Sequence, residues 1–124
     1  MRVTFCGHSR LYADAGLKDK LKREIEKLIS DGADEFFLGG YGQFDTLCAV
    51  AVKELKETYP HINSVLVIPY LERSYNTYLY DETLYPPIED IPKRYAIIKR
   101  NEYMVDKSDV VIRVILISKI YIVL

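Results

Sequence analysis

The stretch of residues 34–45, DEFFLGGYGQFD, decides the class of fold. Its apolar run at 35–38 predicts a short strand, and a segment with helical character follows the run. Between the two lie Gly39, Gly40 and Gly42, which allow positive φ angles and a close approach of the backbone to a ligand. The stretch therefore predicts a strand, a tight turn and a helix, which together are the basic unit of an α/β sheet.

The same alternation extends to both sides of this stretch. Residues 2–6 and 64–70 are rich in strand-forming side chains, and residues 17–29 carry an apolar stripe at helical spacing. The helix after the glycines is expected to run from about residue 44 to residue 59, because Pro60 stops it. Such alternation predicts a Rossmann-like three-layer α/β fold with a mainly parallel sheet of four to five strands. The loops after the first two strands then meet at the carboxyl edge of the sheet, where such folds bind ligands.

The pattern changes after residue 70. Residues 71–91 show no helical stripe and contain four tyrosines and a Pro-Pro pair, so we expect a long ordered loop there. A helix is expected from about residue 92 to residue 106, followed by a fourth strand at 109–117. The apolar tail 118–124 favours a fifth strand, so the whole chain is expected to form a single domain. The inner side of the last helix is expected to carry Ile97, Ile98, Met104 and Val105.

Composition and charge narrow the classes of function. The formal net charge of -1 gives no electrostatic reason to expect nucleic acid or an anionic membrane as a partner. The apolar runs are too short to span a bilayer and the first residues lack the apolar core of a secretory signal, so a cytoplasmic location is expected. Cys6 and Cys48 lie in apolar runs, which predicts two buried reduced thiols. No Cys/His set has the spacing of metal ligands, so neither a metal nor a cofactor is expected.

The glycine turn is also a candidate binding site. From Gly40 it reads G-x-G-x-x-D, whereas a dinucleotide-binding turn has a glycine where Asp45 stands. The free N–H groups at the start of the helix favour an anion, but the Asp45 carboxylate would repel a pyrophosphate and suits a sugar hydroxyl or an amine. The alternative interpretation is structural, with Asp45 capping the helix by accepting a hydrogen bond from a backbone N–H two or three residues further on.

The loop after the first strand contributes further candidates. Gly7 ends that strand, so His8, Ser9 and Arg10 are expected at the same edge of the sheet. Arg10 suits a phosphate because a guanidinium donates two parallel hydrogen bonds, and Ser9 can assist it. His8 is either an acid-base group or a brace of the loop.

The last predicted helix and the long loop add three more candidates. Asn101 either faces the site or holds the neighbouring loop backbone, because a buried Asn needs hydrogen-bond partners. Arg100 is expected to point elsewhere, toward a neighbouring loop or an anion. Glu82 is the carboxylate that we expect to act with Asp45 if the site is catalytic.

Four stretches occur in the order seen in the SLOG superfamily, which the sequence resembles over about residues 2–112: TFCGHSR (4–10), GGYGQFD (39–45), VIPY (67–70) and YAIIKRNEYMVDKSDVVI (95–112). This Rossmann-like group includes the DNA-processing protein DprA (Smf), the cytokinin-activating lonely-guy enzymes and YpsA-like proteins. The likeness is greatest to its small uncharacterised bacterial members. The resemblance implies a pocket for a nucleotide or a phosphorylated nucleoside. Its expected residues are Gly7, His8, Ser9 and Arg10 from the first loop, Gly39, Gly40, Tyr41, Gly42 and Asp45 from the second, and Arg100 and Asn101 at its border.

The sequence departs from the family pattern after the fourth predicted strand. There the hydrolases of the group carry a second glycine-rich loop that supplies phosphate contacts and a catalytic Glu, whereas residues 109–124 contain no glycine. We therefore expect a C-terminally shortened domain that leaves apolar sheet exposed and forms a homodimer.

Three functions stay open from the sequence, so it does not decide whether the protein is an enzyme. The first is a module that binds or senses a nucleotide. The second is a hydrolase that cleaves the N-glycosidic bond of nucleoside monophosphates, with Asp45 and Glu82 as its carboxylates. The third is a DNA-processing interaction protein like DprA, which the near-neutral charge disfavours.

Overall fold

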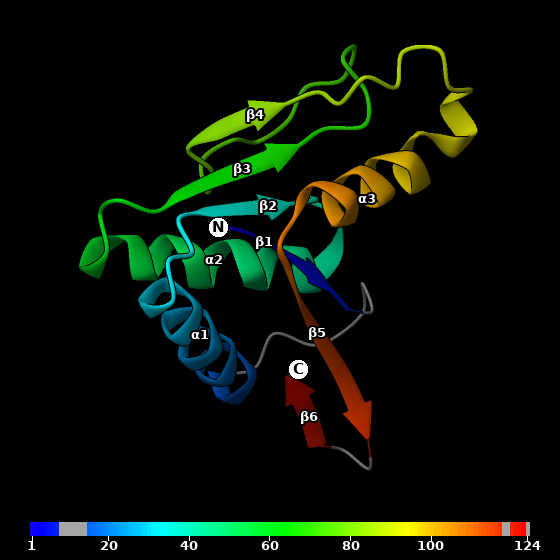
Figure 1. Ribbon diagram of the computed structural model, residues 1–124. Coiled ribbons are helices and arrows are strands. Elements are labelled where there is room, and N and C mark those ends of the chain that lie inside the picture. The colour runs from blue at the N-terminus through cyan, green and yellow to red at the C-terminus, as the bar shows by residue number, and fades with distance from the viewer. Residues whose placement is uncertain (8–14, 118–119, 124) are drawn as a thin grey trace.

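A computed structural model describes residues 1–7, 15–117 and 120–123 of the chain. Strands and helices alternate through its first half, as the sequence predicts (Figure 1). In chain order the elements are β1 (Arg2–Cys6), α1 (Ala15–Ser30), β2 (Glu35–Leu38), α2 (Gly42–Thr58), β3 (Asn63–Val67), β4 (Glu82–Leu84), the short 3₁₀ helix η1 (Lys93–Tyr95), α3 (Ala96–Lys107), β5 (Val110–Ile117) and β6 (Ile120–Val123).

The strands form one six-stranded sheet in the order β4-β3-β2-β1-β5-β6. Strands β1 to β5 are parallel to their neighbours, and β6 alone pairs antiparallel, with β5. The expected mainly parallel sheet of four to five strands is thus confirmed in its five parallel strands, to which β6 adds a sixth. The fold is α/β and Rossmann-like.

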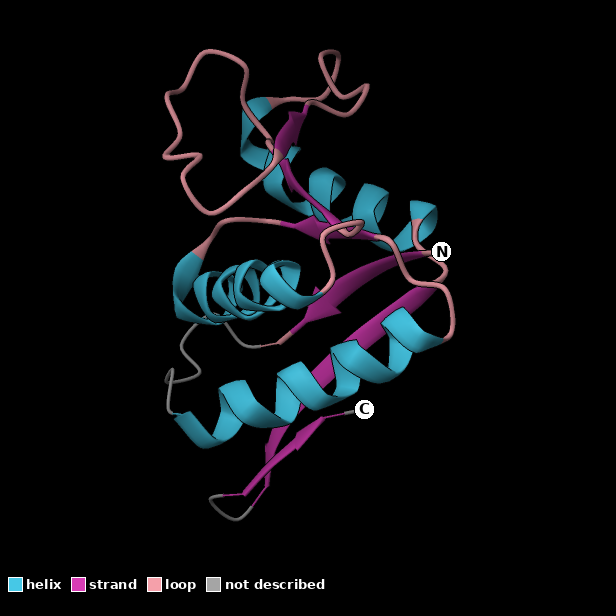
Figure 2. Cartoon of the chain, turned by 90° about the vertical axis from the view of Figure 1, so that its left-hand side faces the viewer, coloured by secondary structure: helices cyan, strands magenta, loops and turns pink. Residues whose placement is uncertain are grey.

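The direction of the chain across the sheet reverses at β1. From β1 the chain proceeds through β2 and β3 to β4 on one side, and α3 then returns it to β5 on the other side of β1. Because parallel crossovers are right-handed, a reversal of direction moves the connecting helix to the opposite face of the sheet. Helices α1 and α2 therefore cover one face and α3 lies against the other (Figures 1 and 2). Such a reversal is the topological switch point at which open α/β sheets bind ligands.

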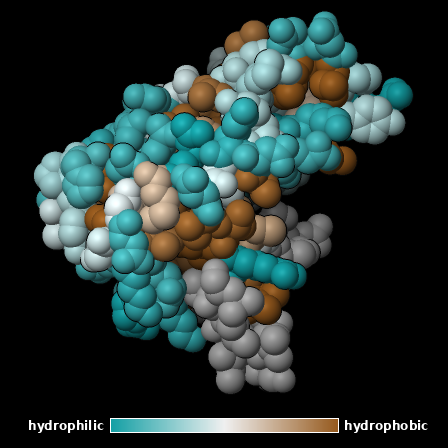
Figure 3. All heavy atoms as spheres, viewed as in Figure 1, coloured by the Kyte–Doolittle hydropathy of each residue, from teal (hydrophilic) through white to brown (hydrophobic). Residues whose placement is uncertain are grey.

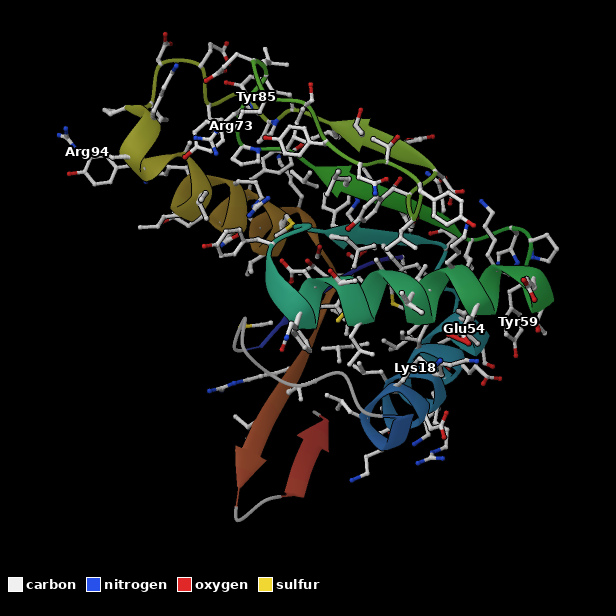
Figure 4. All side chains as sticks on the ribbon, turned by 180° about the vertical axis from the view of Figure 1, so that it is seen from behind. Lys18, Glu54, Tyr59, Arg73, Tyr85 and Arg94 are labelled. Carbon is white, nitrogen blue, oxygen red and sulfur yellow. The ribbon has the colours of Figure 1, made fainter. Side chains whose placement is uncertain are left out.

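The larger half of the core lies under α1 and α2. Leu17, Leu21 and Ile25 recur at a spacing of four along α1 and are almost completely buried. They join a cluster with residues of α2 and of the sheet, and burying each such side chain stabilises the fold by about 1.5–3 kcal/mol. Figure 4 shows Lys18 and Glu54 side by side at the α1–α2 contact, where Lys18 Nζ lies 3.0 Å from Glu54 Oε2.

The opposite face of the sheet is covered less completely. A smaller buried cluster joins α3 to the sheet through Phe37, Val65, Val67 and Met104. The expectation for the inner side of this helix was wrong for Ile98 and Val105, which are 56% and 49% exposed. The buried side chains of α3 are Ala96, Arg100 and Met104, at a spacing of four. An arginine therefore occupies the middle of the inner stripe.

Apolar surface remains on the molecule in this region. Figure 3 shows apolar side chains gathered over the middle of the face seen in Figure 1. Val111 of β5 is 37% exposed, whereas the next residue, Ile112, belongs to the core under α1 and α2. The expected homodimer stays a prediction.

The segment between β3 and α3 differs from the expected plain loop. Within it β4 pairs with β3, with Val65 opposite Glu82. The Asp81 carboxylate fixes this pairing, because it accepts hydrogen bonds at 2.8 Å from both the Ser64 N–H and Lys56 Nζ. Three residues are too few to show a strand pattern, so this strand depends on tertiary contacts. Figure 4 places Arg73 and Tyr85 in the same outer region, away from α1 and α2.

The two cysteines differ in environment. Cys48 on α2 is completely buried, as expected, but Cys6 at the end of β1 is exposed, so the expectation of burial was wrong for Cys6. Cys6 is the last residue of β1, at the carboxyl edge of the sheet, where it lines a pocket instead of the core. Among the residues that the structure describes, no helix combines the length and apolarity needed to cross a membrane.

Candidate functional site

A pocket of about 190 Å³ lies at the carboxyl end of β1, beside the switch point. The end of β1 forms its floor, the start of α2 lies on one side, and α3 forms the other side. Its lining residues are Thr4, Phe5, Cys6, Gly7, Tyr41, Asp45, Ile97, Arg100, Asn101, Met104 and Val105. Three segments that are distant in the sequence thus meet at one edge of the sheet.

Gly7, which follows β1, packs against the first turn of α2. A Cβ on Gly7 would lie only 2.7 Å from the ring of Phe44, so a larger residue would not fit there without a shift. In the second loop, Gly40 and Gly42 have φ angles of 67° and 85°, which non-glycine residues rarely adopt. Gly40 also passes close to β3, because a Cβ there would lie 2.6 Å from Leu66 Cδ1. Glycine is therefore required at the turn for conformation and for close packing.

Asp45 closes the start of α2, but not in the way the sequence suggested. The helix begins at Gly42, with Tyr41 at its N-cap, so Asp45 lies inside the first turn. Its Oδ2 accepts a hydrogen bond of 2.8 Å from the Tyr41 backbone N–H, four residues earlier. The expectation of a bond from an N–H further along the helix was wrong, because α2 begins before Phe44. The carboxylate satisfies a free N–H of the helix start and still lines the pocket.

Arg100 is the most unexpected residue of the site. Its relative exposure is only 2%, a burial that the sequence did not predict, and it reaches Gly39 of the neighbouring glycine turn. Its Nη1 donates to the backbone oxygens of Gly39 and Val67, at 2.7 and 2.8 Å. Its Nε donates to Asn101 Oδ1 at 2.8 Å, so Asn101 orients Arg100. The arginine thus joins Val67, the last residue of β3, to Gly39, which directly follows β2.

The opposite charges of the pocket meet beside Gly39. A Cβ on this glycine would lie 3.0 Å from Asp45 Oδ2 and 3.3 Å from Arg100 Cζ. Burial raises the pKa of Asp45, although the Tyr41 N–H and the charge of Arg100 oppose the rise. Burial likewise lowers the pKa of Arg100, while the charge of Asp45 opposes the fall. Burial therefore disfavours the charged form of both Asp45 and Arg100.

The surroundings of Asp45 are poorly solvated as well. Burial, together with the charge of Asp45, raises the pKa of Tyr80 to about 12. Burial, together with Asp45, raises the pKa of the Cys48 thiol well above its ordinary value. Both groups are neutral near pH 7, so Asp45 and Arg100 carry the charge of this region.

The structure brings many of the predicted site residues together. Gly7, Tyr41, Asp45, Arg100 and Asn101 line the pocket, and Gly39, Gly40 and Gly42 form the adjoining turn. His8, Ser9 and Arg10 lie outside the described residues. Glu82 is exposed at the start of β4, opposite Val65, and is not among the described residues that line the pocket.

Several residues that line the pocket were not predicted as site residues from the sequence. Thr4, Phe5 and Cys6 line it as the end of β1. Ile97, Met104 and Val105 line it from α3, on the same helical face as Asn101. Their signal in the sequence was the spacing of Ile97, Asn101 and Val105 at intervals of four, which places them on one face. Among the described residues, no group of His, Cys, Asp and Glu is arranged to hold a metal ion.

Comparisons with known proteins agree on one family. The profile of YpsA, described as the YspA SLOG family, matches residues 13–85. The UPF0398 protein BH1768 of Halalkalibacterium halodurans is 29% identical over 105 residues, which cover 75% of this chain and 56% of that protein. The matched region therefore spans little more than half the length of this relative.

Proposed function

Because the chain belongs to the YspA SLOG family, we propose that it is a module that binds or senses a nucleotide or a phosphorylated nucleoside at the pocket beside β1. The resemblance of the sequence to nucleotide-binding members of the SLOG superfamily supports this ligand class. The chemistry of the pocket supports it independently, through a glycine turn, a helix start and a buried arginine.

One observation carries the proposal: three predicted segments converge at the switch point of the sheet. Gly7, Asp45 and Arg100 come from different parts of the sequence, yet they line the same pocket. Ligands of open α/β sheets bind at such a position, outside the carboxyl ends of the strands. The first turn of α2 adds backbone N–H groups that favour an anionic group of the ligand.

The arrangement favours binding over hydrolysis of an N-glycosidic bond. Hydrolysis of a glycosidic bond normally requires two carboxyl groups that flank the scissile bond. Asp45 is the single carboxylate among the described residues that line the pocket, and Glu82 lies at the opposite end of an edge strand. A binding or sensing role needs no second carboxylate.

Thermal shift and calorimetry against a panel of nucleoside mono-, di- and triphosphates test the proposal. A ligand that binds only the folded state raises the melting temperature, by an amount that grows with its concentration. We expect at least one nucleotide to raise it and to give saturable heat at micromolar to millimolar concentration. If neither method detects binding of any nucleotide, the proposal is wrong.

A pair of variants on α3 locates the site. Val105 lines the pocket, whereas Ile98 lies on the same helix, is similarly exposed and does not line it. Val105→Trp should narrow the pocket and weaken binding by at least about tenfold, and Ile98→Trp should bind like the wild type. Equal affinity of both variants would place the nucleotide elsewhere on the protein.

A further inference from the structure

Gly39 is the starting point for a more specific inference about the ligand. Among the described glycines, positive φ angles occur at Gly32, Gly40 and Gly42, so the backbone of Gly39 does not require glycine. What Gly39 provides is space, because Asp45 and Arg100 both lie where its side chain would be. A bare backbone here lets an anion and a cation approach the same point.

The hydrogen bonds of these two side chains are incomplete within the described structure. Arg100 uses Nε and Nη1 for the three bonds to Asn101, Gly39 and Val67. Its Nη2 has no acceptor among the described residues and lies at the pocket that Arg100 lines. Asp45 uses Oδ2 for the Tyr41 N–H, and its Oδ1 has no donor among the described residues. A donor and an acceptor of the pocket are therefore available to a ligand.

The two charged groups do not satisfy each other. No ion pair within 4.0 Å joins Asp45 to Arg100 in the part of the chain that the structure describes. Yet both pack against the same side of Gly39, where an added Cβ would lie 3.0 Å from Asp45 Oδ2 and 3.4 Å from Arg100 Nη2. The two groups are therefore close enough for one further atom to contact both of them.

The chemistry of that bridging atom is restricted. A phosphate oxygen would accept from Arg100 but would be repelled by Asp45, and an ammonium group would have the reverse difficulty. A hydroxyl oxygen accepts a hydrogen bond from the guanidinium and donates its own proton to the carboxylate.

We propose that a ribose hydroxyl of the ligand lies between Asp45 and Arg100 and bridges them. This inference rests on the proposed nucleotide-binding function and adds the part of the ligand that the charged pair recognises. The phosphate then lies toward the start of α2 or the first loop, away from the Asp45 carboxylate.

Calorimetry with a nucleotide that binds the wild type, and with its 2′-deoxy, 3′-deoxy and 2′,3′-dideoxy analogues, tests the proposal. Removing the bridging hydroxyl leaves the proton acceptor and the guanidinium unsatisfied, so we expect at least one deoxy analogue to bind about tenfold more weakly or worse. If the dideoxy analogue binds within about twofold of the parent, the bridging hydroxyl is wrong and the nucleotide site stands. If no nucleotide binds at all, the proposed function fails together with this inference.

Asp45→Asn ties the effect to this carboxylate. Asparagine keeps the size of Asp45 and an oxygen for the Tyr41 N–H, but its amide offers the hydroxyl a donor in place of an acceptor. We expect the variant to bind the parent nucleotide about tenfold more weakly and to discriminate little between parent and deoxy analogue, as a double-mutant cycle measures. The matched control is Glu82→Gln, which removes an exposed carboxylate outside the pocket and should retain full discrimination. Unchanged discrimination in Asp45→Asn would overturn the assignment.

Discussion

Arg100→Leu should destabilise the protein because it removes the donor that joins two strand ends. In the wild type Nη1 lies 2.7 Å from the Gly39 carbonyl oxygen and 2.8 Å from that of Val67. Leaving the buried Val67 carbonyl unsatisfied costs about 1–3 kcal/mol, and the partly buried Gly39 carbonyl adds a smaller loss. Part of the loss is offset, because leucine avoids the cost of burying the guanidinium that also lowers its pKa. We therefore expect a net loss of about 1–3 kcal/mol in the free energy of unfolding.

Urea unfolding followed by circular dichroism measures this loss as a lower midpoint with an unchanged slope. Lys99→Leu is the matched control, because Lys99 is the neighbouring residue, is exposed and makes only a surface pair with Glu102 at 3.2 Å. Its effect should stay below about 0.5 kcal/mol. The loss of stability in Arg100→Lys should lie between those of Arg100→Leu and Lys99→Leu, because one ammonium group cannot reproduce the planar set of guanidinium donors. If Arg100→Leu is as stable as the wild type to within about 0.5 kcal/mol, the two carbonyls do not depend on Arg100 and the reasoning fails.

Two further predictions concern carboxylates with opposite pKa shifts. Burial opposes ionisation of Asp81, but the hydrogen bonds from Lys56 and Ser64 outweigh it and lower the pKa, so ionised Asp81 stabilises the fold above pH 3.8. Asp81→Asn should therefore be less stable than the wild type at pH 7. The difference between their urea midpoints should vanish as the pH falls below 3.8 and Asp81 becomes protonated. A difference that does not change with pH would contradict this prediction. Burial raises the pKa of Asp45, so its ionisation destabilises the fold as the pH rises. Asp45→Asn should therefore melt at the same temperature as the wild type at pH 7, or at a higher one, and the difference should disappear in acid. A variant that melts at a lower temperature than the wild type at pH 7 would show that ionised Asp45 stabilises the fold.

The parts of the fold that the sequence could predict are those with a local signal. The four-residue spacing of Leu17, Leu21 and Ile25 depends only on helical geometry, and it identified α1 before any tertiary contact was known. The glycine turn is equally local, because the positive φ angles of Gly40 and Gly42 restrict the residue type at their own positions. Alternation of such elements then fixed a parallel sheet and its binding edge.

The parts that the sequence could not predict depend on partners distant in the chain. Strand β4 has three residues and is held by the contacts of Asp81 with Ser64 and Lys56. Arg100 was expected to reach a neighbouring loop or an anion and to border the pocket, and no pattern in the sequence indicated that it would be buried. Its burial becomes favourable only when the ends of β2 and β3 present two carbonyl acceptors to α3, which no local pattern reveals.

The separation of Asp45 and Arg100 is consistent with the proposed binding site. Opposite charges taken out of water offset their desolvation only when they contact each other with good geometry. Here each is anchored to backbone, Asp45 to the Tyr41 N–H and Arg100 to strand-end carbonyls, and the anchors hold the two charges apart. Anchoring them apart keeps a donor and an acceptor available beside Gly39, at a cost in solvation that the pKa shifts of both groups reflect. We therefore expect the proposed ligand to gain affinity from a group that both accepts from Arg100 and donates to Asp45.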